Sequence, residues 1–179
     1  MKNKKRKIVV DASVAHAAGD TSLYPTSKQC RETLMAIGEY SAVFCPNLKD
    51  EWKRHESAFA RAWKVKMIQE GRAIFLIQDQ VLDEFKQFIE DSQADIYARG
   101  AMDKDAHLVS VALTNDKIIV ALDEKVRKLF SKHCLNFKGV KKVLWSNPMI
   151  DQDGTVSWLK SGAKREKNFT LESFATRLK

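Results

Sequence analysis

Short runs of apolar residues alternate with segments of helical period along most of the chain. In the longer segments the apolar residues recur every three or four positions, which is the period of a helix that packs on a sheet. Regular alternation of strand and helix favours an α/β sandwich with a central, mainly parallel sheet of about five strands. The predicted strands are residues 7–10, 42–45, 73–77, 118–122 and 143–145.

Three longer helices are predicted between the strands, at residues 27–39, 49–70 and 103–113. The second is expected to be continuous, because Trp52 and Trp63 lie on one apolar stripe at helical spacing and Gly71 follows as a C-terminal cap. Shorter helices are expected around residues 81–89, 126–130 and 171–178.

The composition suits a single globular domain with a buried core, since 44% of the 179 residues are hydrophobic and 30% are charged. It changes after residue 150, where a turn at 151–154 precedes a basic, polar stretch. We therefore expect a domain over residues 1–150, with a basic N-terminal tail at 1–7. Residues 151–179 are interpreted as a basic C-terminal appendage and not as a second domain.

A net charge of +8 favours a polyanionic partner such as nucleic acid, although a basic surface can also serve solubility alone. No stretch approaches the ~20 apolar residues that cross a bilayer, so no membrane partner is expected. The apolar run before Asp11 is too short for a signal peptide. Cys30, Cys45 and Cys134 form no C-x-x-C pair, which indicates reduced thiols in a cytoplasmic protein and no structural zinc.

Acidic residues follow two of the predicted strands directly. Asp11 comes after the first strand and Asp123 after the fourth, while Glu51 lies near the start of the helix after the second. The carboxyl ends of parallel strands meet at one edge of a sheet, where sites of α/β proteins are built. These three carboxylates are therefore expected to share one edge.

A fourth carboxylate reaches this edge if the helix before the fourth strand begins near residue 103. A crossover helix runs antiparallel to its strands, so Asp105 in the first turn would lie at the same edge. Asp103 competes with it, but Asp105 lies above the apolar face of the helix, where a carboxylate is costly unless something binds it. We favour Asp105 as the site residue and expect Asp103 to support it or to cap the helix.

Each acid also has an ordinary explanation. Asp11 and Asp123 suit helix caps, and Glu51 in an early helical turn complements the helix dipole. The site hypothesis depends on four acids converging on one edge, because like charges gathered at close range need a compensating cation. Carboxylate oxygens alone suit hard ions such as Mg²⁺ or Mn²⁺.

The segments IVVDASV (8–14), LKDEW (48–52), DKDAHLVSVAL (103–113) and IIVALDEKV (118–126) together resemble PIN-domain nucleases. The resemblance spans roughly residues 7–145. It implies a three-layer α/β/α fold and Mg²⁺- or Mn²⁺-dependent cleavage of RNA, as in VapC-type toxins. Carried over to this chain, the metal-binding and catalytic residues fall on Asp11, Glu51, Asp105 and Asp123. The resemblance also allows an antitoxin-like protein partner and a homodimer.

Cationic and hydroxyl groups near these acids are predicted to bind the substrate. Lys49, Lys53 and Arg54 flank Glu51, and Ser13 is expected either to bind metal or phosphate or to cap the following helix. Two basic runs are interpreted either as phosphate contacts or as solvated surface. They comprise Lys2, Lys4, Lys5, Arg6 and Lys7, and Lys160, Lys164, Arg165 and Lys167.

Other classes of protein fit the same pattern less well. A nucleic-acid-binding module without hydrolysis would share the charge and fold but would have no need of four acids. A phosphatase with an Asp nucleophile would want a second Asp at position 13, where this chain has Ser13. A receiver domain would want paired acids at the first strand. A scaffold that forms a dimer or binds an antitoxin-like partner stays open, and such partners are compatible with catalysis. The sequence therefore predicts a metal-dependent endoribonuclease, with the binding module as the alternative.

Overall fold

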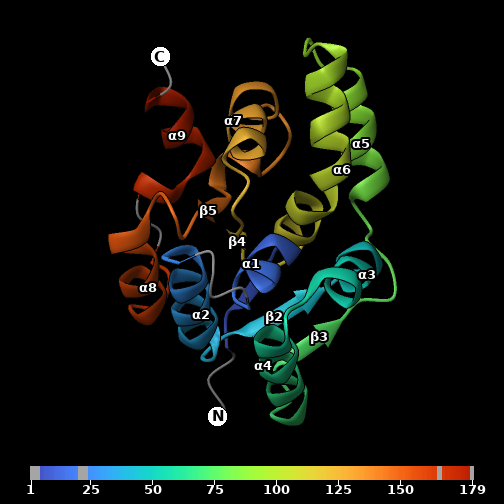
Figure 1. The fold of residues 1–179 in the computed structure, drawn as a ribbon. Helices are drawn as coiled ribbons and strands as arrows, with labels where there is room; N and C mark the ends of the chain where they lie inside the picture. Colours follow the sequence, from blue (N-terminus) through green and yellow to red (C-terminus); the bar gives the residue numbers. More distant parts are fainter. Residues whose placement is uncertain (1–4, 20–23, 165–166, 178–179) are drawn as a thin grey trace.

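The computed structural model describes residues 5–19, 24–164 and 167–177, except for the side chains of residues 152, 153 and 167. Five parallel strands form one sheet in the order β3-β2-β1-β4-β5 (Figure 1). The prediction of a three-layer α/β/α sandwich is confirmed. The strands are β1 Lys7–Val10, β2 Ser41–Phe44, β3 Ala73–Phe75, β4 Ile118–Val120 and β5 Leu144–Ser146.

Helices cover the sheet and connect its strands (Figure 1). Helix α2 packs against α8, α7 packs against α9, and α5 pairs with α6 in a hairpin that extends away from the sheet. Within the described residues, no helix is both long and apolar enough to cross a membrane. The α-helices are α1 Ala12–Ala17, α2 Thr26–Ile37, α3 Pro46–His55, α4 Ala58–Gln69, α5 Leu82–Glu90, α6 Ile96–Leu113, α7 Glu124–His133, α8 Gln152–Lys160 and α9 Leu171–Arg177, with 3₁₀ turns η2 Val140–Lys142 and η3 Lys167–Phe169.

Strand β1 is the centre of the sheet and pairs on both sides. Ile8 aligns with Ala42 of β2, and Val10 aligns with Val120 of β4. Both aligned pairs are fully buried, as expected for parallel strands covered by helices on both faces. This register brings the residues after β1 and β4 to the same edge.

The predicted continuous helix over 49–70 is wrong, because the chain bends between α3 and α4. Glu56 and Ser57 have extended backbone, with ψ of 134° and 165°, and the Ser57 hydroxyl accepts a hydrogen bond from Ala60 N–H at 3.2 Å. This bond caps a new helix. The apolar stripe continues across the bend, since the rings of Trp52 and Trp63 lie 5.8 Å apart. The spacing of the apolar residues alone therefore did not predict the break between α3 and α4.

The helix that carries Asp105 begins at Ile96, seven residues before the predicted start at 103. Asp95 caps it by accepting a hydrogen bond from Ala98 N–H at 2.8 Å. The prediction that Asp105 lies in the first turn is therefore wrong, and Asp105 lies in the middle of α6. The early turns of α6 pack on α5, and the later turns pack near β1 and β4.

The C-terminal segment packs onto the rest of the chain where the structure describes it. Leu159 and Leu171 are fully buried in the common core. The Tyr40 hydroxyl donates to the Leu159 carbonyl at 2.6 Å, and the Leu171 N–H donates to the Val143 carbonyl at 3.0 Å. Arg6, before β1, donates to the Gly162 carbonyl at 2.7 Å. This segment therefore contributes to the stability of the sandwich.

A truncation in this segment tests that contribution. We expect Leu171→Ala to lower the free energy of unfolding by about 2–5 kcal/mol, because the side chain is fully buried and its removal leaves a cavity. Urea unfolding followed by circular dichroism measures the change. Ile150→Ala, at a side chain that is 56% exposed, is the control and should shift stability by less than about 0.5 kcal/mol. Equal, small effects of the two variants would contradict packing of the segment on the core.

Candidate acidic site

Asp11 lies between the end of β1 and the start of α1. Its backbone N–H donates to the Val120 carbonyl of β4 at 2.9 Å, which fixes its position at the carboxyl edge. Its carboxylate accepts hydrogen bonds from the Ser13 N–H at 3.1 Å and from the Ser13 hydroxyl. The Ser13 hydroxyl oxygen also accepts a bond from Leu122 N–H at 3.3 Å. Ser13 therefore links Asp11 to the loop that carries Asp123.

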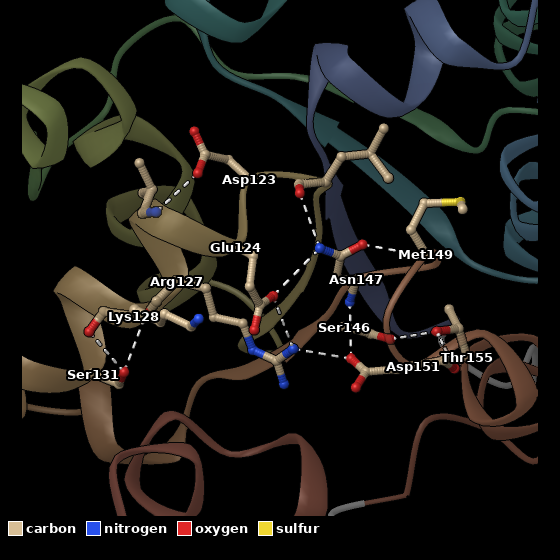
Figure 2. Close-up of polar contacts among 12 residues, drawn as sticks. Asp123, Glu124, Arg127, Lys128, Ser131, Ser146, Asn147, Met149, Asp151 and Thr155 are labelled. Atoms are coloured by element: carbon tan, nitrogen blue, oxygen red, sulfur yellow. Dashed lines mark hydrogen bonds and ion pairs between the residues drawn. The ribbon is translucent and has the colours of Figure 1, made fainter. Parts of the chain in front are cut away.

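Asp123 follows β4 and caps α7, accepting a hydrogen bond from Val126 N–H at 2.9 Å. Its loop is held by Asn147, which follows β5 at the same edge (Figure 2). The Asn147 amide donates to the Leu122 carbonyl at 2.9 Å and to Glu124 Oε2 at 3.3 Å. The sequence analysis missed Asn147, although a polar residue directly after the last strand was a signal for it.

Glu51 pairs with His107, a buried residue of α6 that the sequence analysis had not assigned to the site. Glu51 Oε2 lies 3.2 Å from His107 Nε2, an ion-pair distance without the alignment of a good hydrogen bond. His107 Nδ1 lies 3.1 Å from the Lys104 carbonyl. Burial lowers the pKa of His107, but the contact with Glu51 and the nearby carboxylates of Asp105 and Asp11 raise it above its ordinary value overall. The acidic surroundings therefore favour the charged form of the His107 imidazole.

Asp105 interacts electrostatically with the other three acids. Burial raises its pKa, and repulsion from Asp11, Asp123 and Glu51 raises it further, to about 6, against the opposing effect of His107. Burial and the charge of Glu51 likewise raise the pKa of Asp11, although the hydrogen bonds from Ser13 oppose the rise. Asp105 is therefore close enough in space to Asp11, Asp123 and Glu51 to be repelled by each of them.

Asp103 lies outside this group. Its carboxylate is half-exposed and pairs with the Lys86 ammonium of α5 at 3.0 Å. The geometry therefore associates Asp105 with the other acids and places Asp103 on the outer face of α6. The choice of Asp105 over Asp103 as a metal-binding residue stays a prediction.

Carboxylate oxygens and negative charge are of the kind that a hard divalent cation requires, but the side chains as they lie do not form a coordination site among the described residues. Four carboxylates supply oxygen ligands, and their mutual repulsion is the energetic cost that such an ion would relieve. The side chains are nevertheless turned toward protein groups, Glu51 toward His107 and Asp11 toward Ser13. Among the described residues, no three His, Cys, Asp or Glu side chains are gathered closely enough to hold one ion.

The predicted substrate-binding residues divide between two places. Lys49 and Lys53 are exposed on α3 beside Glu51, while Arg54 lines a hollow beyond the other end of α1. Lys5 and Arg6 lie before β1, at the edge opposite the acids. Lys5 pairs with Glu39 at 3.6 Å, and Arg6 binds backbone carbonyls.

Several members of the predicted basic runs have no described side chain. Lys2, Lys4 and Arg165 lie outside the described residues, and the same holds for the side chain of Lys167. Lys160 and Lys164 are exposed on either side of Gly162 and Ala163, whose carbonyls bind Arg6 at the opposite edge of the sheet. The described parts of the basic runs therefore do not contribute to the acidic site.

Comparison of the chain with protein-family models, with curated proteins and with solved structures gives no match. The likeness to PIN-domain nucleases therefore remains a resemblance carried by the order and spacing of short segments. What the structure adds is independent of that resemblance: the strand order, the shared edge and the electrostatic coupling of the acids.

The raised pKa of Asp105 makes a prediction about stability in EDTA. A carboxyl whose pKa is about 6 in the folded state and 3.8 ordinarily favours folding while protonated. Its stabilising contribution is complete below about pH 4 and is lost as the pH rises through 6. We expect Asp105→Asn to raise the free energy of unfolding at pH 7.5 by about 1–2 kcal/mol, after allowance for solvent screening, and by much less at pH 4.

Urea titrations at the two pH values measure this difference. Asp103→Asn is the matched control, because it makes the same change two residues away at an exposed ion pair. It should have little effect or a small destabilising one at pH 7.5. Destabilisation by Asp105→Asn at pH 7.5 would contradict the electrostatic account of the site.

Proposed function

We propose that the protein is a divalent-metal-dependent endoribonuclease that hydrolyses RNA phosphodiester bonds at the acidic edge of the sheet. The observation that carries the proposal is the convergence of Asp11, Glu51, Asp105 and Asp123 from four separate segments, where burial and then repulsion from the other three acids raise the pKa of Asp105 to about 6. Such an arrangement is costly without a cation, so its presence at the functional edge of an α/β sheet supports metal binding.

The four carboxylates would hold Mg²⁺ or Mn²⁺. A bound ion of this kind supplies a water of lowered pKa and neutralises charge on phosphoryl oxygens. The neighbouring residues position the ligands: Ser13 orients Asp11, and the imidazole of His107 restrains Glu51. Asn147 fixes the loop on which Asp123 is presented.

RNA is the substrate class favoured by the net charge of +8 and by the sequence resemblance. The alternative is a nucleic-acid-binding module of the same fold without hydrolysis. One observation favours that alternative: within the part of the chain that the structure describes, no three potential ligands already surround a common point. An antitoxin-like partner, a homodimer and a toxin role stay predictions from the resemblance.

Cleavage assays separate these two functions. We expect purified protein to cut a mixture of single-stranded and structured RNA with Mn²⁺ or Mg²⁺ and to be inactive with EDTA. Asp11→Asn should reduce the rate by at least about 100-fold, because it removes one ligand charge while keeping the side-chain shape. Gel analysis of labelled RNA gives the rates.

Asp83→Asn, an exposed residue in the first turn of α5, is the matched control and should cleave at the wild-type rate. If neither wild-type nor control cuts RNA with any divalent ion, but both bind RNA in a salt-dependent manner that Asp11→Asn leaves unchanged, the nuclease proposal is wrong. The binding module then becomes the better account.

A further inference from the structure

A hollow of about 530 Å³ lies between the end of α1, helix α2 and the bend between α3 and α4. It is separate from the acids, which lie at the start of α1. Several of the side chains that line the hollow are basic or polar. They are His16, Arg31, Arg54, His55 and Ser57.

Among the residues that the structure describes, the two arginines of this hollow have no acidic partner. Arg31 donates to the Ala18 carbonyl and, at 3.3 Å, to the Gly19 carbonyl, and Arg54 donates to the Asp50 carbonyl at 3.3 Å. No described carboxylate forms an ion pair with either guanidinium. Within the described part of the chain, the charges of both guanidinium groups in the hollow are therefore without a carboxylate counter-ion.

The carboxylate that also lines the hollow is already neutralised. Glu56 is paired with Arg61 at 3.3 Å and with Lys64, and its side chain is almost completely buried. It is therefore no counter-ion for Arg31 or Arg54. The electrostatic balance of the hollow favours an anion.

The N-terminus of α4 also favours an anion in the hollow. Ser57, Ala58 and Phe59 line the hollow at the start of this twelve-residue helix, and the Ser57 hydroxyl satisfies only the Ala60 N–H. The first turn of α4, at the positive end of its helix dipole, therefore forms one wall of the hollow. The bend that interrupts the predicted long helix is thus what creates this helix terminus.

The walls of the hollow are held by contacts between segments distant in sequence. The Ser57 hydroxyl donates to the Ala15 carbonyl at 2.7 Å, and His16 Nδ1 lies 3.1 Å from the His55 carbonyl. Gly19 packs so closely on Ser57 that a Cβ at Gly19 would lie 2.1 Å from the Ser57 Cβ. A site formed in advance loses little entropy on binding.

Two helices connect this hollow to the acidic edge. His16 follows Asp11 by five positions on α1, and His55 follows Glu51 by four positions on α3. At the rise of an α-helix these separations are about 6–8 Å along the axes. A strand whose scissile phosphate lies at the acids could therefore reach the hollow with a neighbouring nucleotide.

We infer that this hollow is a phosphate subsite that binds a backbone phosphate of the RNA strand next to the one at the acidic edge. The inference rests on the proposed function for its substrate, but its residues are distinct from the metal ligands. Arg54 and Arg31 supply the charge, and the start of α4 supplies N–H donors. The subsite sets how the strand lies across the acids and is used by substrates longer than a dinucleotide.

Binding of a fluorescent twelve-nucleotide single-stranded RNA tests the subsite without cleavage. Asp11→Asn protein is used in EDTA, with and without Arg54→Gln, at several salt concentrations. Loss of one phosphate contact should weaken binding about 5–10-fold and reduce the salt slope of log K by about 0.7. Arg54 is exposed and makes one backbone bond, so the variant should fold normally.

Lys132→Gln, which removes one charge from the exposed face of α7, is the control and should leave both quantities unchanged. An Arg54→Gln variant with unchanged affinity and salt slope would overturn the subsite. An effect of Arg54→Gln on protection against heat by inorganic phosphate, with RNA binding unaffected, would also overturn it in favour of a free phosphate ligand.

The subsite and the nuclease can fail separately. RNA binding that depends on Arg54 in a protein that cuts no RNA supports the subsite and refutes the proposed activity. Cleavage that depends on Asp11 with a KM unaffected by Arg54→Gln supports the activity and refutes the subsite. A raised KM with unchanged kcat in Arg54→Gln supports both.

Discussion

Parallel pairing of β1 with β2 on one side and β4 on the other determines where every candidate group lies. Because Val10 aligns with Val120 and Asp11 N–H bonds to the Val120 carbonyl, the residues after both strands leave the sheet at one edge. The same edge receives the residues after β5, and so Asn147 reaches the loop of Asp123. A shift of one residue in this pairing would turn the side chains of β1 to the other face and separate the acids.

The electrostatics of the edge follow from this arrangement. Carboxylates brought together by the sheet repel one another, and the fold offsets part of the repulsion with groups of its own. The hydrogen bonds from Ser13 stabilise the charged form of Asp11, and the contact with Glu51 raises the pKa of His107 and so favours its charged form. No described residue donates a hydrogen bond to the Asp105 carboxylate, and its pKa is about 6 although His107 partly opposes the rise. Negative charge that these groups do not offset remains at the edge, and this charge is the reason for proposing that a cation binds there.

The sequence predicted the sheet and its edge well because both depend on local signals. Apolar runs mark strands, and an acid directly after a run must lie at a strand end, which suffices for Asp11 and Asp123. The break at Glu56 was missed because an apolar stripe crosses it. The start of α6 at Ile96 was missed because polar residues come directly before it and interrupt the apolar pattern. The pairing of His107 with Glu51 had no local signal, since it depends on how α6 packs against α3.

The central claim is that Asp11, Glu51, Asp105 and Asp123 together bind a divalent cation, and anomalous X-ray diffraction from crystals soaked in Mn²⁺ tests it most directly. The account predicts an anomalous peak at the carboxyl edge of the sheet, within about 2.0–2.6 Å of carboxylate oxygens from at least two of these residues. The peak should be absent in Asp11→Asn crystals. Well-occupied Mn²⁺ elsewhere on the protein, with these carboxylates still turned to Ser13 and His107, would contradict the claim.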